Sequence, residues 1–176
     1  MLESRMKKEK TMLAYKVVMV GDFGVGKTSL VKRFVDNSFS EEYLSTIGVS
    51  ISKKAINDST LMLWDIEGHT EFKPIFKQYL SGAKGFIVVA DINRQNTIES
   101  IQRHIELCHS SVKNAPICIA LNKSDIHHTL DENDMQKLKE LSEFVVEVYK
   151  TSAKEGSAVA DIFNELDEHI SKSIKK

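Results

Sequence analysis

The segment 21–28, Gly-Asp-Phe-Gly-Val-Gly-Lys-Thr, limits the possible folds of this chain more than any other stretch. It fits the pattern G-x-x-x-x-G-K-[ST], in which glycines let the backbone approach an anion and successive N–H groups point inward toward phosphate oxygens. An apolar, β-branched run at 15–20 precedes it, and apolar residues recur at helical spacing over 30–35. A strand, a glycine loop and a helix in this order predict a phosphate-binding loop rather than an ordinary glycine-rich turn.

The positions of this loop have separate expected roles. Lys27 would reach the β- and γ-phosphates of a nucleotide, and the Thr28 hydroxyl would bind Mg²⁺. The helix that starts near Lys27 adds the positive end of its dipole. We therefore expect nucleotide contacts along the whole loop and from the serine behind it: Gly21, Asp22, Phe23, Gly24, Val25, Gly26, Lys27, Thr28 and Ser29.

Strand-like and helix-like segments alternate along the rest of the chain. Continuous apolar runs predict buried strands, alternating residues predict a half-exposed strand at 49–55, and Asn57-Asp58 predicts a hairpin turn. This pattern predicts an α/β fold with a six-stranded, mainly parallel sheet, one antiparallel edge strand and helices on both faces. The strands are expected at 15–20, 49–55, 61–64, 85–90, 116–121 and 144–149, within one domain at 14–174 that follows a flexible tail at 1–13.

Helices are predicted between these strands, where apolar residues recur at helical spacing. The segment 72–80 has this spacing, but Pro74 predicts that its helix starts late or irregularly. A last helix is expected at 159–170. Capping-box spacing predicts the starts of two other helices: Asn96 with Glu99, and Thr129 with Glu132.

Three short polar motifs follow predicted strands, at the carboxyl ends where such sheets bind ligands. Asp65 of the first motif can hold Mg²⁺, and Gly68 can offer its N–H to a γ-phosphate. In 122–125, Asn-Lys-Ser-Asp, the last carboxylate can accept from N1–H and the exocyclic amine of guanine, whereas adenine has no donor at N1. The motif 151–154, Thr-Ser-Ala-Lys, can offer N–H groups to a base carbonyl. Each motif alone could be a polar turn, but chance does not explain all of them in order.

Composition excludes several classes of function. The 176 residues carry a formal net charge of −1 and have a sequence pI of about 6.6, which does not favour a nucleic-acid partner. No apolar run is long enough to span a membrane, and the start lacks an apolar signal core. Cys108 and Cys118 lie in apolar segments, which indicates core residues in a reducing compartment, so we expect a cytoplasmic protein.

Taken together, these motifs resemble the Ras superfamily of small GTPases, from Tyr15 to the final helix. The segments 43–51, 63–65 and 79–85 resemble the Rab branch most closely. The resemblance implies a switch role with bound GTP or GDP and Mg²⁺. It also implies effector proteins as partners, together with an exchange factor and a GTPase-activating protein.

The family also implies roles for individual residues. Phe39 would pack against the guanine and Tyr43 would lie over the phosphates. Thr46 would complete the Mg²⁺ shell that Thr28 and Asp65 begin. The base would be read by Asn122 and Asp125, with the stem of Lys123 along its face, and by the turn of Ser152, Ala153 and Lys154, in which the Ala153 N–H meets the base oxygen.

Three positions in the expected catalytic centre depart from the family. His69 stands where a glutamine commonly orients the attacking water, Glu67 replaces an alanine, and Phe23 replaces a glycine or serine. The ring of Phe23 would crowd the γ-phosphate pocket and the path of a partner's arginine. The carboxylate of Glu67 would oppose the negative charge that develops there.

Three hypotheses remain open. In the first, which we favour because three departures coincide, the protein is a GTP-binding switch with very slow hydrolysis. In the second, a partner activates His69 as a catalytic residue beside Lys27 and Gly68, since translational GTPases share the D-x-x-G-H pattern. In the third, guanine nucleotide is only structural in an interaction module, although the intact Mg²⁺ residues argue against this. A P-loop kinase fits less well because 122–125 specifies guanine.

The surface residues complete these expectations. The chain ends at Lys176 without a prenylation motif and has no myristoylation glycine, so this sequence carries no membrane anchor. Either the protein works without lipid, or a lipidated tail lies outside this sequence.

Four histidines are expected to be exposed and to bind no metal: His104, His109, His127 and His128. Effectors would read a surface of the switch segments: Ile47, Val49, Trp64, Phe72, Ile75 and Tyr79.

Overall fold

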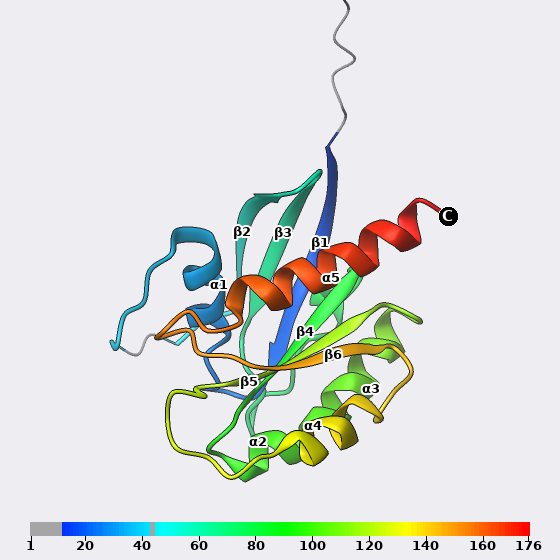
Figure 1. The fold of residues 1–176 in the computed structure, drawn as a ribbon. Coiled ribbons are helices and arrows are strands. Elements are labelled where there is room, and N and C mark those ends of the chain that lie inside the picture. Colours follow the sequence, from blue (N-terminus) through cyan, green and yellow to red (C-terminus); the bar gives the residue numbers. More distant parts are fainter. Residues whose placement is uncertain (1–11, 43–44) are drawn as a thin grey trace, which may run out of the picture.

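The computed structural model describes residues 12–42 and 45–176, which form one six-stranded sheet covered by helices (Figure 1). The strands are β1 Leu13–Gly21, β2 Val49–Ile56, β3 Ser59–Ile66, β4 Gly85–Asp91, β5 Ile117–Asn122 and β6 Val145–Lys150. The helices are α1 Lys27–Asp36, α2 Gln95–Glu99, α3 Ile101–Ser111, α4 Glu132–Lys139 and α5 Val159–Ile174.

The sheet has the order β2-β3-β1-β4-β5-β6. The edge strand β2 runs antiparallel to β3, and the four other neighbouring pairs are parallel. Asn57, with φ 49°, makes the turn between β2 and β3. The predicted fold class, its single antiparallel edge strand and the hairpin are therefore confirmed.

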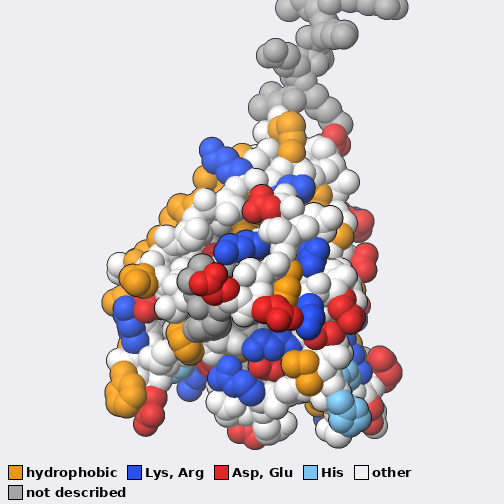
Figure 2. All heavy atoms as spheres, turned by 90° about the vertical axis from the view of Figure 1, so that its left-hand side faces the viewer, with side chains coloured by type: hydrophobic (Ala, Val, Ile, Leu, Met, Phe, Trp, Pro, Cys, Tyr) orange, Lys and Arg blue, Asp and Glu red, His pale blue; other side chains and the backbone are white. Residues whose placement is uncertain are grey.

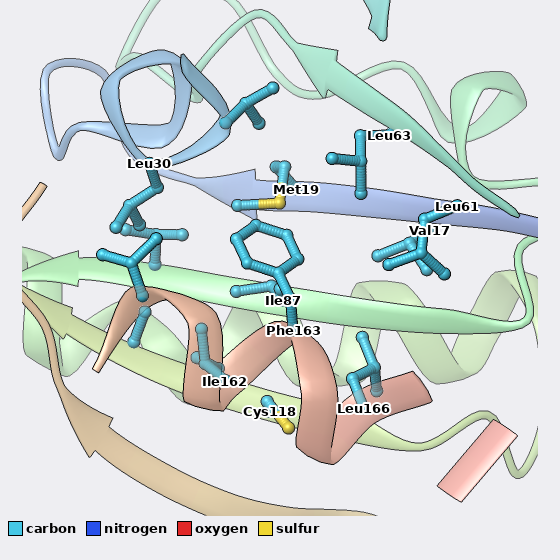
Figure 3. Close-up of a cluster of buried hydrophobic side chains, with 14 of the residues drawn as sticks. Val17, Met19, Leu30, Leu61, Leu63, Ile87, Cys118, Ile162, Phe163 and Leu166 are labelled. Carbon is cyan, nitrogen blue, oxygen red and sulfur yellow. The ribbon is translucent and has the colours of Figure 1, made fainter. Parts of the chain in front are cut away.

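Alternating residues of the central strands supply two cores, one on each face of the sheet. Val17 and Met19 of β1 face α1 and α5, whereas Val18 and Val20 face α3. Figure 3 shows the Phe163 ring reaching from α5 toward the sheet, near Met19 and Ile87. Both cysteines are buried and free, as expected. Because the strands are apolar on both faces, the sheet is fixed between two layers of helices.

The segment after β3 forms less helix than its apolar spacing suggests. Only Lys77–Tyr79 forms a short 3₁₀ turn, and Phe72 is 91% exposed. Pro74 lacks the N–H that a helix interior needs, which agrees with the late start expected from the sequence.

Both predicted capping boxes are wrong. The helix expected over 98–105 is divided into α2 and α3 at Ser100, and neither helix has a side-chain cap. α4 is capped by Asp131 with Asp134, two residues after the predicted Thr129 pair. Each box has the required spacing, so spacing alone could not choose between overlapping candidates.

None of the helices within the described ranges is long and apolar enough to cross a bilayer. The strand β1 begins at Leu13, inside the segment expected as a tail, while residues 1–11 lie outside the described part of the chain.

Phe163→Ala should lower the free energy of unfolding by about 3–5 kcal/mol, because the ring is fully buried and stacks on Phe34 at 4.0 Å between ring centroids. Ile174→Ala on the same helix, where the side chain is 41% exposed, should cost less than about 1 kcal/mol. Urea unfolding at one fixed nucleotide concentration measures both values. Equal losses would contradict the packing described for α5.

Candidate functional site

One cavity of about 360 Å³ lies at the carboxyl ends of the parallel strands. It is bounded by the loop after β1, the segment before β2, and the turns after β5 and β6. Most of the residues expected to contact a nucleotide line it: Phe23, Gly24, Gly26, Lys27, Thr28, Ser29, Phe39, Thr46, Gly68, Asn122, Lys123, Asp125, Ala153 and Lys154.

On the face that carries the segment around residues 37–48, cationic and anionic side chains lie interspersed (Figure 2). Sequence reasoning did not include several polar residues that border the cavity: Lys32, Ser40, Glu41 and Glu42.

Lys27 lies at the inner wall of the cavity. Its Nζ donates to the carbonyl oxygens of Gly21 and Asp22 at 3.4 and 3.1 Å, and burial lowers the pKa of Lys27 to about 8. Gly26 has φ +102°, and a Cβ there would lie 2.2 Å from the Asn122 amide nitrogen. Only glycine therefore allows the loop to pack this closely on the motif after β5.

Three oxygen-bearing side chains meet beside Lys27. The Thr28 hydroxyl donates to Asp65 Oδ2 at 2.5 Å and lies 2.7 Å from the Thr46 hydroxyl. Asp65 is buried, and burial raises its pKa. Among the described residues, its second oxygen, Oδ1, has no hydrogen-bond partner. A buried carboxylate oxygen without a donor, next to two hydroxyls, is a donor set that suits a hard cation such as Mg²⁺.

At the other end of the cavity, the turn after β6 orients the motif after β5. Ser152 donates from Oγ to Asp125 Oδ1 at 2.7 Å. Asn122 accepts the Ala153 N–H at 3.3 Å and donates to the Val25 carbonyl at 3.0 Å. The exposed Asp125 carboxylate is therefore held at this wall of the cavity.

Arg33 of α1 supports this turn from outside the cavity, a role that the sequence analysis missed. Its Nε donates to the Ala153 carbonyl at 2.7 Å, and its Nη2 donates to the Lys154 carbonyl at 2.6 Å. Lys154 also pairs with Glu41 at 3.0 Å across the mouth of the cavity.

His69 is joined to the phosphate loop through its backbone. The His69 N–H donates to the Gly21 carbonyl, and the Phe23 N–H donates to the His69 carbonyl, both at 3.0 Å. His69 does not line the cavity. Instead, it lines a neighbouring hollow of about 430 Å³. Phe23 borders both spaces.

Gly68 touches the phosphate loop directly. A Cβ on Gly68 would lie 2.7 Å from Phe23 Cα and 2.9 Å from Lys27 Nζ. This approach requires glycine, and it places Gly68 beside the ammonium that is expected to meet the γ-phosphate.

The structure corrects the expectation that His104 is exposed. His104 is 1% exposed, and its Nε2 lies 2.8 Å from Asp22 Oδ1. Its ring meets the His69 ring edge-on, with 5.9 Å between centroids. The helical spacing of 101, 104, 105 and 108 would have placed His104 on the buried face of α3. His109 is half-buried against Phe144, whereas His127 is exposed.

Glu67 also lies away from the cavity lining. Its carboxylate accepts from the Lys73 ammonium and, at 3.3 Å, from the Gly48 N–H; these hydrogen bonds lower the pKa of Glu67. Its negative charge is therefore directed toward Gly48 and Lys73 rather than toward the space beside Lys27.

The remaining expected residues have various positions. Val25 is fully buried behind the loop, and Tyr43 lies outside the described residues. No group of three His, Cys, Asp or Glu side chains suited to a metal occurs within the described ranges.

The residues of the expected effector surface differ in exposure. Ile47 and Phe72 are 85% and 91% exposed, and the others are half-buried: Val49, Trp64, Ile75 and Tyr79.

Comparison with known proteins agrees with this geometry. The profile of the Ras family matches residues 16–172. Ras-related protein Rab-32A of Dictyostelium discoideum is 35% identical over 173 residues, which cover 90% of this chain and 78% of that relative. Ras-related protein Rab-11A of the same organism is 37% identical over 86% of this chain and 73% of its own length. Ras-related protein Rab-13 of Canis lupus familiaris is 32% identical over 86% and 77%, respectively.

Asp125→Asn should weaken GDP binding by about 2 kcal/mol or more, roughly thirtyfold, because an amide N–H₂ would face base donors where the carboxylate now accepts. Asp161→Asn, which removes an exposed carboxylate from α5, should leave the affinity unchanged. Fluorescence titration or calorimetry gives both dissociation constants. An unchanged GDP affinity in Asp125→Asn would contradict the assignment of Asp125 as the residue that binds the base.

Proposed function

The chain belongs to the Ras family, and we propose that it is a guanine-nucleotide-dependent switch whose intrinsic hydrolysis of GTP is slow. In this proposal, GTP and Mg²⁺ order the segments that carry Thr46 and Gly68, and loss of the γ-phosphate releases them. Effector proteins then distinguish the two states.

The proposed Mg²⁺ ligands are Thr28, Thr46 and Asp65. The unpaired Asp65 oxygen beside two hydroxyls supports this assignment. When bound, the ion would neutralise charge on the β- and γ-phosphates. Lys27 would add a second positive charge from the inner wall, and the Gly68 N–H would donate to the γ-phosphate.

The proposed guanine site is the wall formed by the turns after β5 and β6. Asp125 would accept from the base, oriented by the Ser152 hydroxyl. Phe39 and Lys123 border the same end of the cavity and would cover the faces of the ring. Adenine would leave the Asp125 carboxylate unpaired, so the site should reject it.

The position of His69 carries the proposal of slow hydrolysis. Its ring packs edge-on against the His104 ring, with 5.9 Å between centroids, and His69 lines the neighbouring hollow rather than the cavity. Orienting an attacking water requires a side chain within hydrogen-bond reach of it. In this arrangement His69 does not line the cavity, so it lacks that access unless its side chain turns toward the cavity.

A second candidate is a GTPase in which a partner repositions His69 as the catalytic group. Burial is the main cause that lowers the pKa of His69, and the nearby Arg103 and His104 lower it further. This shift favours the neutral imidazole, which is the state that a general base needs. A module that uses guanine nucleotide only structurally has less support, because it has no use for the oxygen cluster beside Lys27.

We propose the exposed apolar residues of the switch segments, above all Ile47 and Phe72, as the effector surface. An exchange factor and a GTPase-activating protein are the further expected partners. Both cysteines are free and buried, which fits a reducing compartment, and we place the protein in the cytoplasm.

The test is single-turnover hydrolysis of preloaded GTP with Mg²⁺. His69→Ala should change the rate by less than about twofold, because the imidazole does not reach the cavity. Phe23→Gly should raise the rate about tenfold, or about 1.4 kcal/mol in barrier, because it opens the path to the γ-phosphate.

A rate that falls tenfold or more in His69→Ala would show that the imidazole takes part in hydrolysis without a partner, which would contradict the position given to it here. The dissociation constants of GDP for both variants serve as the control, because a change in nucleotide affinity would point to a different cause.

A further inference from the structure

Glu67 lies between the two segments that the proposed switch depends on. The segment 45–48 carries Thr46 and leads into β2, and the segment 68–73 begins at Gly68 and follows β3. Glu67 contacts both segments, and its side-chain partners, Gly48 and Lys73, do not line the cavity. These contacts therefore use no group that a nucleotide in the cavity would have to displace.

The first contact uses both backbone groups of Gly48. The Glu67 N–H donates to the Gly48 carbonyl at 2.8 Å, and the Gly48 N–H donates to Glu67 Oε2 at 3.3 Å. Gly48 has φ +70° and lies directly before β2. One residue thus fixes the end of the Thr46 segment through its backbone and its side chain.

The second contact is an ion pair with Lys73. The Lys73 ammonium lies 2.8 Å from Glu67 Oε2 and 2.9 Å from Oε1. Lys73 is held by Thr70, which donates its N–H to the Lys73 carbonyl at 3.0 Å and accepts the Lys73 N–H on Oγ1 at 2.9 Å. The Lys73 side chain is 48% exposed and the Glu67 side chain 25% exposed, so this is an ion pair at the surface.

Both contacts lie one or two residues from groups that the nucleotide would meet. Thr46 precedes Gly48 by two residues and touches Thr28, and Gly68 follows Glu67 directly and abuts Lys27. A constraint on Glu67 therefore limits the positions of the Thr46 and Gly68 N–H groups together.

We propose that Glu67 is a positioning residue that holds both switch segments in their GTP-binding arrangement before the γ-phosphate arrives. This inference rests on the proposed function and concerns the regulation of the same site. A ligand binds more tightly when the competent arrangement is already populated, because less of its binding free energy goes into ordering the protein. GDP has no γ-phosphate for Thr46 and Gly68, so Glu67 should favour GTP selectively.

The test compares the dissociation constants of GDP and of a non-hydrolysable GTP analogue, with Mg²⁺, in Glu67→Ala and Lys73→Met. Each variant should weaken binding of the analogue about fivefold and change GDP binding by less than about twofold. The double variant should lose little more than Glu67→Ala alone, because Lys73→Met removes an ion pair that Glu67→Ala already removes. Amide hydrogen exchange in the GDP form should become faster in both segments, 45–50 and 68–73.

Glu71→Ala is the matched control, because Glu71 is an exposed carboxylate in the same segment. It should change neither dissociation constant. The inference is overturned if Glu67→Ala leaves the ratio of the two constants unchanged, whether both stay constant or both rise equally, since a merely structural role predicts no selectivity. Failure of the proposed function looks different: the unmodified protein would then bind neither guanine nucleotide.

Discussion

The parallel pairing of β1 with both β3 and β4 is the constraint on which the site depends. It places the carboxyl end of β1 at the centre of the sheet, with Met19 opposite Asp65 on one side and Gly21 opposite Val89 on the other. The phosphate loop therefore begins between the ends of its neighbours. The next strand, β5, brings Asn122 to the Val25 carbonyl across 97 residues of sequence. Every functional motif is short and local, and the sheet order makes them one cavity.

The sequence predicted the fold and most of the cavity, because each motif follows a strand and parallel strands end at one edge. It failed where tertiary contacts decide between equal local patterns. The spacing of Thr129 with Glu132 is as good as that of Asp131 with Asp134, and only the latter caps α4. The expectation that His104 is exposed overlooked its helical spacing, which it shares with the buried residues 101, 105 and 108. Its partner Asp22 lies 82 residues away, so no local signal reveals the pair.

The sequence analysis expected the three departures from the family to meet in one catalytic centre, but only Phe23 lines the cavity. Phe23 borders both the cavity and the hollow that His69 lines. Glu67 faces Gly48 and Lys73. The space beside Lys27 is therefore bordered by backbone, by Gly68 and by the oxygen cluster of Thr28, Thr46 and Asp65. We therefore propose that the site holds a triphosphate with Mg²⁺ but activates a water poorly, which would keep the switch long in one state.

The most direct test of this account is the nucleotide carried by the freshly purified protein, released by denaturation and separated by chromatography. The account predicts guanine nucleotide, and mostly GTP, because binding is intact while hydrolysis without a partner is slow. Mostly GDP would contradict slow hydrolysis and show that Phe23, Glu67 and His69 leave the reaction unimpaired. Adenine nucleotide would contradict the roles given to Asp125 and the turn after β6.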